Sequence, residues 1–213
     1  KDFTYLIDGD DTRENILKLL DTRIKAIPVL SKSKKLIRLV TEKTIDWNES
    51  SKVISKAKSP VRITFSGGGT DLTTYFYKAN GVVFNATINK FTHAVLEKRD
   101  DGLIKITSHD LKQEVQCNNL ADLKLNGELD LIKAVLINLA PSFGFNLYTY
   151  SDVPPGSGLG GSAVLVSAVI GAFNNFRKNK LDLYEIAELA FHSERIVLSM
   201  DGGWQDQYAT VFG

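Results

Sequence analysis

The segment of this sequence best suited to chemistry is a run of four glycines and two serines between residues 154 and 162. It reads Pro-Pro-Gly-Ser-Gly-Leu-Gly-Gly-Ser, and an apolar, helix-favouring run follows from Ala163 to Phe176. Glycines let the backbone approach a ligand closely, and the first N–H groups of a helix carry a partial positive charge. The pattern therefore predicts a phosphate-binding loop at a helix N-terminus. The alternative is a flexible loop before a core helix, which the two stiffening prolines disfavour.

Two carboxylates further along the chain could complete a site for phosphoryl transfer. Such transfer needs ligands for a divalent cation and usually a carboxylate beside the attacking hydroxyl. Glu194 is a candidate ligand for Mg²⁺, with Ser162 supplying a hydroxyl to the same ion. Asp206 follows Gly202–Gly203, where the backbone can turn tightly beneath a ligand. Taken alone, Glu194 could also be a solvated carboxylate paired with Arg195, and Asp206 could be a helix N-cap.

From Pro60 onward, alternating strands and helices must position these residues. Strands are expected at 61–65, 82–88, 93–98, 103–107 and 145–150, and helices at 129–139, 162–176, 183–198 and from 204 to 212. The strand at 61–65 runs into Ser66–Asp71, a second glycine-rich turn, and the strand at 145–150 leads into the first. The buried stripe of the helix at 183–198 is expected to consist of Leu183, Ile186, Ala187, Ala190 and Ile196.

The first 45 residues predict a small α/β unit of their own. It should hold strands at 3–7, 26–30 and 36–40 and a helix at 13–22. Residues 46–59 are polar and predict a linker that can end in a strand. The main domain is expected at 60–213.

Composition narrows the classes of protein that this chain can represent. The 213 residues are 43% hydrophobic, with 26 basic against 25 acidic side chains and a net charge of +1. This balance gives no positive electrostatic field that would attract nucleic acid. No apolar run approaches the ~18 residues that a membrane-spanning helix needs. Cys117 is the one cysteine, so the sequence can form neither an intrachain disulfide nor a cysteine zinc site. A reducing, cytoplasmic location is expected.

Three segments resemble motifs of the GHMP kinases, the superfamily of galactokinase, homoserine kinase, mevalonate kinase and phosphomevalonate kinase. Val61–Leu72 is similar to the family's first motif, and Pro154–Ala163 is similar to its second. Gly202–Tyr208 resembles the segment in which the sugar kinases carry a catalytic aspartate. The Gly-Gly-Gly-Thr-Asp form of the first motif is most like the D-glycero-D-manno-heptose 7-phosphate kinases, with the L-fucokinase kinase domain close by. The resemblance covers roughly residues 57–213.

The resemblance implies a role for each segment. The ATP phosphates would be held by Pro155, Gly156, Ser157, Gly158, Leu159, Gly160, Gly161 and Ser162. Ser162 and Glu194 would bind Mg²⁺, while Asp206 would accept the proton of the sugar hydroxyl or orient that hydroxyl. The substrate would contact Gly68, Gly69, Thr70, Asp71 and Arg62. An ionised aspartate can accept hydrogen bonds from two hydroxyls, although a strand arginine is often only an ion-pair partner.

The implied fold is α+β, namely the ribosomal-protein-type βαβ fold of the GHMP N-terminal domain, with a mixed sheet and helices on one side. The implied function is ATP-dependent phosphorylation of a sugar or sugar phosphate at its anomeric hydroxyl, with D-glycero-D-manno-heptose 7-phosphate as substrate, in nucleotide-activated sugar biosynthesis. Sugar and ATP would be the partners, without nucleic acid or membrane. A fucokinase-like kinase and a non-catalytic regulatory or binding fragment are the alternatives.

Two features depart from the family pattern. The sequence ends seven residues after Asp206 (213 − 206 = 7), without the family's third glycine-rich motif, so a fragment with little kinase activity alone is expected. In addition, Phe3–Val40 resembles a single cystathionine β-synthase (CBS) repeat. Such repeats normally pair to bind adenine nucleotides, and the acidic residue that often follows the position of Thr41 is missing. A regulatory or dimerising unit, which would allow a homo-oligomer, and an inert remnant both remain open.

Overall fold

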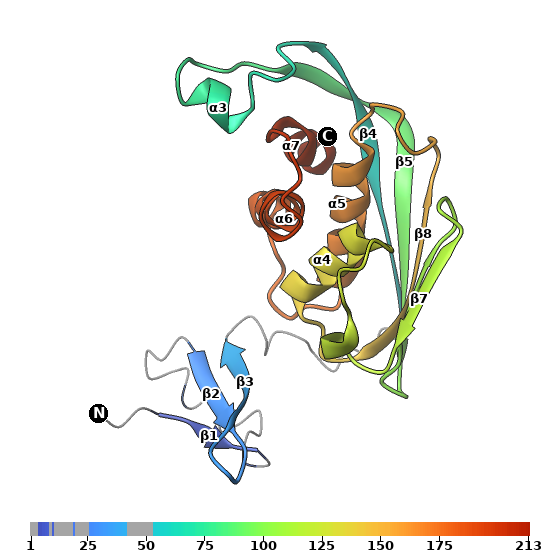
Figure 1. Cartoon of the computed structure of the whole chain (residues 1–213). Helices are drawn as coiled ribbons and strands as arrows, with labels where there is room; N and C mark the ends of the chain where they lie inside the picture. Colours follow the sequence, from blue (N-terminus) through green and yellow to red (C-terminus); the bar gives the residue numbers. More distant parts are fainter. Residues whose placement is uncertain (1–3, 9, 11–18, 20–25, 42–52) are drawn as a thin grey trace. The chain divides into compact units, whose positions relative to one another are not determined.

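The computed structural model describes residues 4–8, 10, 19, 26–41 and 53–213, and the chain divides into two compact units, 1–49 and 50–213 (Figure 1). No helix in the described part of the chain is both long and apolar enough to cross a membrane. Each unit is described by itself below.

The first unit contains a three-stranded sheet in the order β1–β2–β3. Strand β1 (Leu6–Ile7) runs parallel to β2 (Ala26–Leu30), which pairs antiparallel with β3 (Leu36–Thr41). Ile27, Val29 and Val40 form its buried cluster, with Leu6 and Leu19 packed against it. The expected helix at 13–22 lies outside the described residues except for Leu19. The CBS-like resemblance of this unit stays a prediction.

The second unit is built on a five-stranded mixed sheet in the order β4–β5–β8–β6–β7. Its strands are β4 (Ile54–Ser66), β5 (Phe84–Arg99), β6 (Ile104–Ser108), β7 (Gln113–Cys117) and β8 (Gly144–Ser151). All neighbouring strands pair antiparallel except β6 and β8, which are parallel. The larger helices cover one face of this sheet, which confirms the expected α+β architecture (Figure 1).

Helix α5 (Gly161–Asn174) is the central helix of the layer that covers the sheet. It packs on β4 and β5 and contacts α4 (Asp130–Leu139), α6 (Leu183–Phe191) and α7 (Gln205–Phe212). The short helix α3 (Thr73–Phe76), the 3₁₀ turn η1 (Leu120–Asp122) and the π-helical turn η2 (His192–Val197) complete the unit. Nine buried residues of α5 fix its N-terminus against the sheet, beside the end of β8.

Strand β4 extends further than its apolar residues indicate. It begins at Ile54, so the last residues of the expected linker, 54–59, lie in the sheet. Ser55 and Ser59 face inward while Lys56 and Lys58 are exposed, because α5 packs closely here and leaves room only for small side chains. Strand β5 is likewise continuous where two strands were expected. The edge strand β7, which has little apolar pattern, was not expected.

The helix expected at 183–198 changes geometry before its end. The α-helix stops at Phe191 and a π-helical turn follows from His192 to Val197. Ala187 and Ala190 are buried as expected, but Leu183 is 48% and Ile196 61% exposed. Ile196 lies nine residues after Ala187 (196 − 187 = 9), about two and a half helical turns, and so lies on the opposite face. Ser193 and Glu194 take the buried positions instead.

Candidate active site

The glycine-rich loop joins the end of β8 to the first turn of α5. Gly156, Gly158 and Gly160 have φ values of 77°, 74° and 78°, a left-handed conformation that favours glycine. Gly160 caps α5 without a side-chain hydrogen bond to the first N–H groups of the helix. A cavity of about 460 Å³ lies along this loop and is also lined by Arg62 and Asp206. The geometry is that of an anion-binding helix N-terminus.

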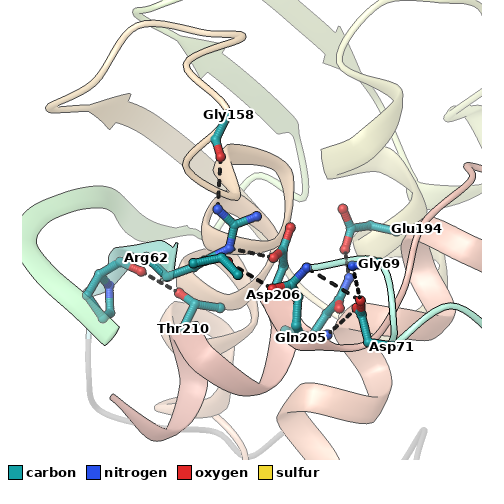
Figure 2. Close-up of polar contacts among 11 residues, drawn as sticks. Arg62, Gly69, Asp71, Gly158, Glu194, Gln205, Asp206 and Thr210 are labelled. Carbon is teal, nitrogen blue, oxygen red and sulfur yellow. Dashed lines mark hydrogen bonds and ion pairs between the residues drawn. The ribbon is translucent and has the colours of Figure 1, made fainter. Parts of the chain in front are cut away.

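Arg62 connects this loop to helix α7. Its Nε donates a 2.7 Å hydrogen bond to Oδ1 of Asp206, and its Nη1 donates one of 2.8 Å to the carbonyl of Gly158 (Figure 2). The side chains of Arg62 and Asp206 are only 11% and 21% exposed. The structure thus gives Arg62 the ion-pair role that was left open, and it places Asp206 at the cavity.

Glu194 is fully buried, which excludes the alternative of a solvated carboxylate. Its Oε2 accepts a hydrogen bond from Nε2 of Gln207, while its Oε1 has no hydrogen-bond partner among the described residues. Burial raises the pKa of Glu194 above its ordinary value of 4.5, and the Ser162 hydroxyl and the Gln207 amide partly offset this increase. A carboxylate oxygen without a partner, near a hydroxyl, suits a hard cation such as Mg²⁺.

Asp71 lies at the N-terminus of helix α7. Its Oδ1 accepts from the backbone N–H of Gly69 at 3.1 Å, and its Oδ2 accepts from that of Gln205 at 3.0 Å (Figure 2). A carboxylate at this end of a helix is favoured by the helix dipole. Gly203 makes the approach possible, since a Cβ there would overlap the Asp71 carboxylate.

A second cavity, of about 380 Å³, opens beside Asp71. Its lining residues are Thr70, Asp71, Phe76, Gly81, Val83, Trp204 and Tyr208. The Trp204 indole stacks on the Phe191 ring, with centroids 3.5 Å apart and planes inclined by 9°. One face of Trp204 is therefore packed against another side chain, while the residue also lines the cavity.

Two glutamines that flank Asp206 connect parts of this site, and sequence reasoning missed both. Gln205 accepts a 2.9 Å hydrogen bond from the Thr64 hydroxyl and contacts Asp71, while Gln207 contacts Glu194. Their positions on either side of the expected catalytic aspartate were the only sequence signal. Residues from three distant segments of the chain therefore meet at the first turn of α7 (Figure 2).

A known protein family matches part of the second unit. Residues 130–213 match the family described as GHMP kinases N terminal domain. The match runs from the first residue of α4 to Gly213. The expected resemblance to the GHMP kinases is therefore confirmed for residues 130–213.

Individual relatives that this chain resembles are named as sugar kinases. The chain is 43% identical over 163 residues to a D-glycero-alpha-D-manno-heptose 7-phosphate kinase of Campylobacter jejuni, covering 74% of this chain and 48% of the relative. It is 31% identical to an L-fucokinase/L-fucose-1-P guanylyltransferase of Bacteroides fragilis, covering 72% of this chain and 19% of the relative.

A solved structure that is named as a heptose kinase also matches this chain. The crystal structure of a D-glycero-D-manno-heptose 1-phosphate kinase from Bacteroides thetaiotaomicron matches with a TM-score of 0.70 and 34% identity, over 76% of this chain and 54% of that one. The chain thus spans about half the length of the heptose kinases that it matches.

Proposed function

We propose that this chain belongs to an ATP-dependent kinase that phosphorylates a sugar or sugar phosphate at its anomeric hydroxyl. The observation that carries the proposal is the contact of Asp206 with Arg62, because it puts a carboxylate beside a glycine-rich helix N-terminus. D-glycero-D-manno-heptose 7-phosphate is the proposed substrate, supported by the 43% identical relative. Nucleotide-activated sugar biosynthesis is the proposed setting, since the fucokinase relative is named together with a guanylyltransferase.

The loop residues would bind the phosphates of ATP. N–H groups from Gly156 to Ser162 and the dipole of α5 would attract the negative charge. Ser162 and Glu194 would hold Mg²⁺, whose charge would offset that of the phosphates. Burial of Glu194 keeps its carboxylate away from bulk water, so its interaction with a cation is screened little.

The remaining residues would hold and activate the sugar. Asp206 would accept a hydrogen bond from the attacking hydroxyl, with Arg62 fixing the direction of its carboxylate. Asp71 would accept hydrogen bonds from other hydroxyls at the second cavity, beside Trp204. The two consecutive residues Gln205 and Asp206 would set the spacing between these roles, since Gln205 contacts Asp71.

L-Fucose is the second candidate substrate, because the L-fucokinase relative is 31% identical. The two substrates differ in charge, as the heptose carries a phosphate and fucose does not. A competition experiment in the natural protein that contains this chain, which measures how much of each sugar is phosphorylated, would decide between the two substrates.

The first test is the substitution Asp206→Ala. In the natural protein that contains this chain, transfer from Mg-ATP to D-glycero-D-manno-heptose 7-phosphate should fall at least about a hundredfold, the contribution of a positioned acid or base. Affinity for ATP should change little. Retained transfer would remove Asp206 from the mechanism, and transfer to fucose alone would support the second candidate.

A further inference from the structure

Gln207 lies on α7, next to Asp206, and its side chain is completely buried. Its Nε2 donates to Oε2 of Glu194, and so joins α7 to the π-helical turn η2. A primary amide can donate and accept at once, whereas an ionised carboxylate can only accept. Glutamine therefore holds a charged carboxylate without bringing a second charge into the buried site.

The hydrogen bond from Gln207 makes the two oxygens of Glu194 unequal. Oε2 is occupied, while Oε1 has no hydrogen-bond partner among the described residues. The terminal torsion of a glutamate is broad and roughly two-fold, so the carboxylate alone has little preference for this orientation. We propose that Gln207 is a positioning residue that fixes the Glu194 carboxylate and keeps its Oε1 available to the magnesium ion. The inference rests on the proposed function, in which Glu194 binds Mg²⁺.

The chemistry of the other end of Gln207 agrees with this role. Its Oε1 is also buried without a hydrogen-bond partner in the described part of the chain. Mg²⁺ usually keeps several of its water molecules when it binds to proteins. A water molecule on the ion could donate to this amide oxygen, which would satisfy a group that is otherwise costly to bury.

Other residue types at position 207 would not serve. Lysine or arginine would neutralise Glu194 and compete with the cation. A second carboxylate would repel the Glu194 carboxylate. An apolar side chain would leave Oε2 of Glu194 buried without a donor. Substitution of a residue that orients a metal ligand typically reduces metal affinity by about 10–100-fold.

The experiment measures binding of the non-hydrolysable nucleotide AMPPNP to this chain by calorimetry, once with Mg²⁺ and once with EDTA. The ratio of the two affinities reports the contribution of the ion. Gln207→Met should reduce this ratio at least about tenfold, with the affinity in EDTA unchanged. In the Glu194→Gln background the same substitution should have no further effect on the ratio, because Gln207 acts through Glu194.

Thr210→Val is the matched control. Thr210 is also buried on α7, and its hydroxyl donates a 2.8 Å hydrogen bond to the carbonyl of Pro60, away from Glu194. The Thr210→Val variant should have a lower thermal midpoint of unfolding and an unchanged ratio of the two affinities. Should Gln207→Met not fold, Gln207→Asn, whose shorter side chain cannot keep the same contact, replaces it.

Each outcome has one meaning. An unchanged ratio in a folded Gln207 variant overturns the positioning role while the proposed function stands. Equal reductions of the affinity ratio in the Gln207 and Thr210 variants also overturn the positioning role, since they would indicate a general structural effect. Absence of any magnesium-dependent binding in the unsubstituted chain would overturn the proposed magnesium site itself, and this inference with it.

Discussion

At the scale of single residues, two carboxylates of the site have opposite surroundings. Asp206 is partly exposed, lines the cavity and pairs with Arg62, whereas Glu194 is fully buried and accepts a hydrogen bond from an amide. A paired carboxylate that lines a cavity can meet a substrate hydroxyl, while a buried one with a free oxygen suits a cation. The difference in burial therefore separates the two roles that the sequence suggested for them.

The raised pKa of Glu194 makes the stability of the metal-free protein depend on pH. Its pKa is higher in the folded state than its ordinary 4.5, mainly because of burial. The folded state thus binds this proton more strongly, and its stabilising effect is lost as the pH rises through the folded pKa. In urea unfolding with EDTA, Glu194→Gln should be more stable than the natural sequence at neutral pH. The difference should shrink toward pH 4.

The control for this prediction is Asp101→Asn. Asp101 is exposed, and its hydrogen bond from Arg99 lowers its pKa to about 2, so it should not produce the same dependence between pH 4 and 7. Parallel stability curves for the natural sequence and Glu194→Gln would show that ionisation of Glu194 carries no cost in the fold.

At the scale of elements, the first turn of α7 organises the site. Asp71 contacts its first N–H group, Asp206 faces the glycine-rich loop, and Gln207 faces η2. Figure 2 shows Asp71, Glu194 and Asp206 near one another on separate parts of the ribbon. The start of one helix therefore sets the relative positions of the proposed sugar, phosphate and metal contacts.

Gly203→Ala tests this organisation. The added Cβ would overlap the Asp71 carboxylate and push it away from α7. Overpacking of this kind costs about 1–3 kcal/mol, so the free energy of unfolding should fall by that amount. Sugar affinity should also fall, because Asp71 loses its position. Gly161→Ala is the stability control, as its Cβ would meet nothing within 4 Å. Equal stabilities of the two variants would contradict the argument.

Elements with local signals could be predicted from the sequence, and contacts between elements could not. Helix α5 and its loop follow from glycines and an apolar run, and the strand at 26–30 matches its expected bounds. Ser55 and Ser59 face inward but are polar, so the sequence pattern predicted a linker where β4 begins. The π-helical turn and the bond between Gln207 and Glu194 depend on how α6 and α7 meet, which no local pattern encodes.

At the scale of the whole molecule, every residue of the candidate site belongs to one compact unit. Arg62, Asp71, Ser162, Glu194 and Asp206 all lie within 50–213, together with the five-stranded sheet and the helices that cover it. The buried cluster of the first unit is formed by other residues, from Ile27 to Val40. The two units therefore have separate cores, which is the physical condition for separate folding.

The last prediction follows from this separation. A chain of residues 50–213 should fold on its own, with a cooperative thermal transition and the same magnesium-dependent affinity for AMPPNP as the chain of 213 residues. The reason is that its sheet, its helical layer and the residues proposed to bind nucleotide all remain. Calorimetry of both chains under identical conditions measures the two properties. If the shorter chain folds but binds the nucleotide more weakly, residues 1–49 contribute to binding, and a regulatory role for the first unit gains support. If it does not fold, the two cores are not independent.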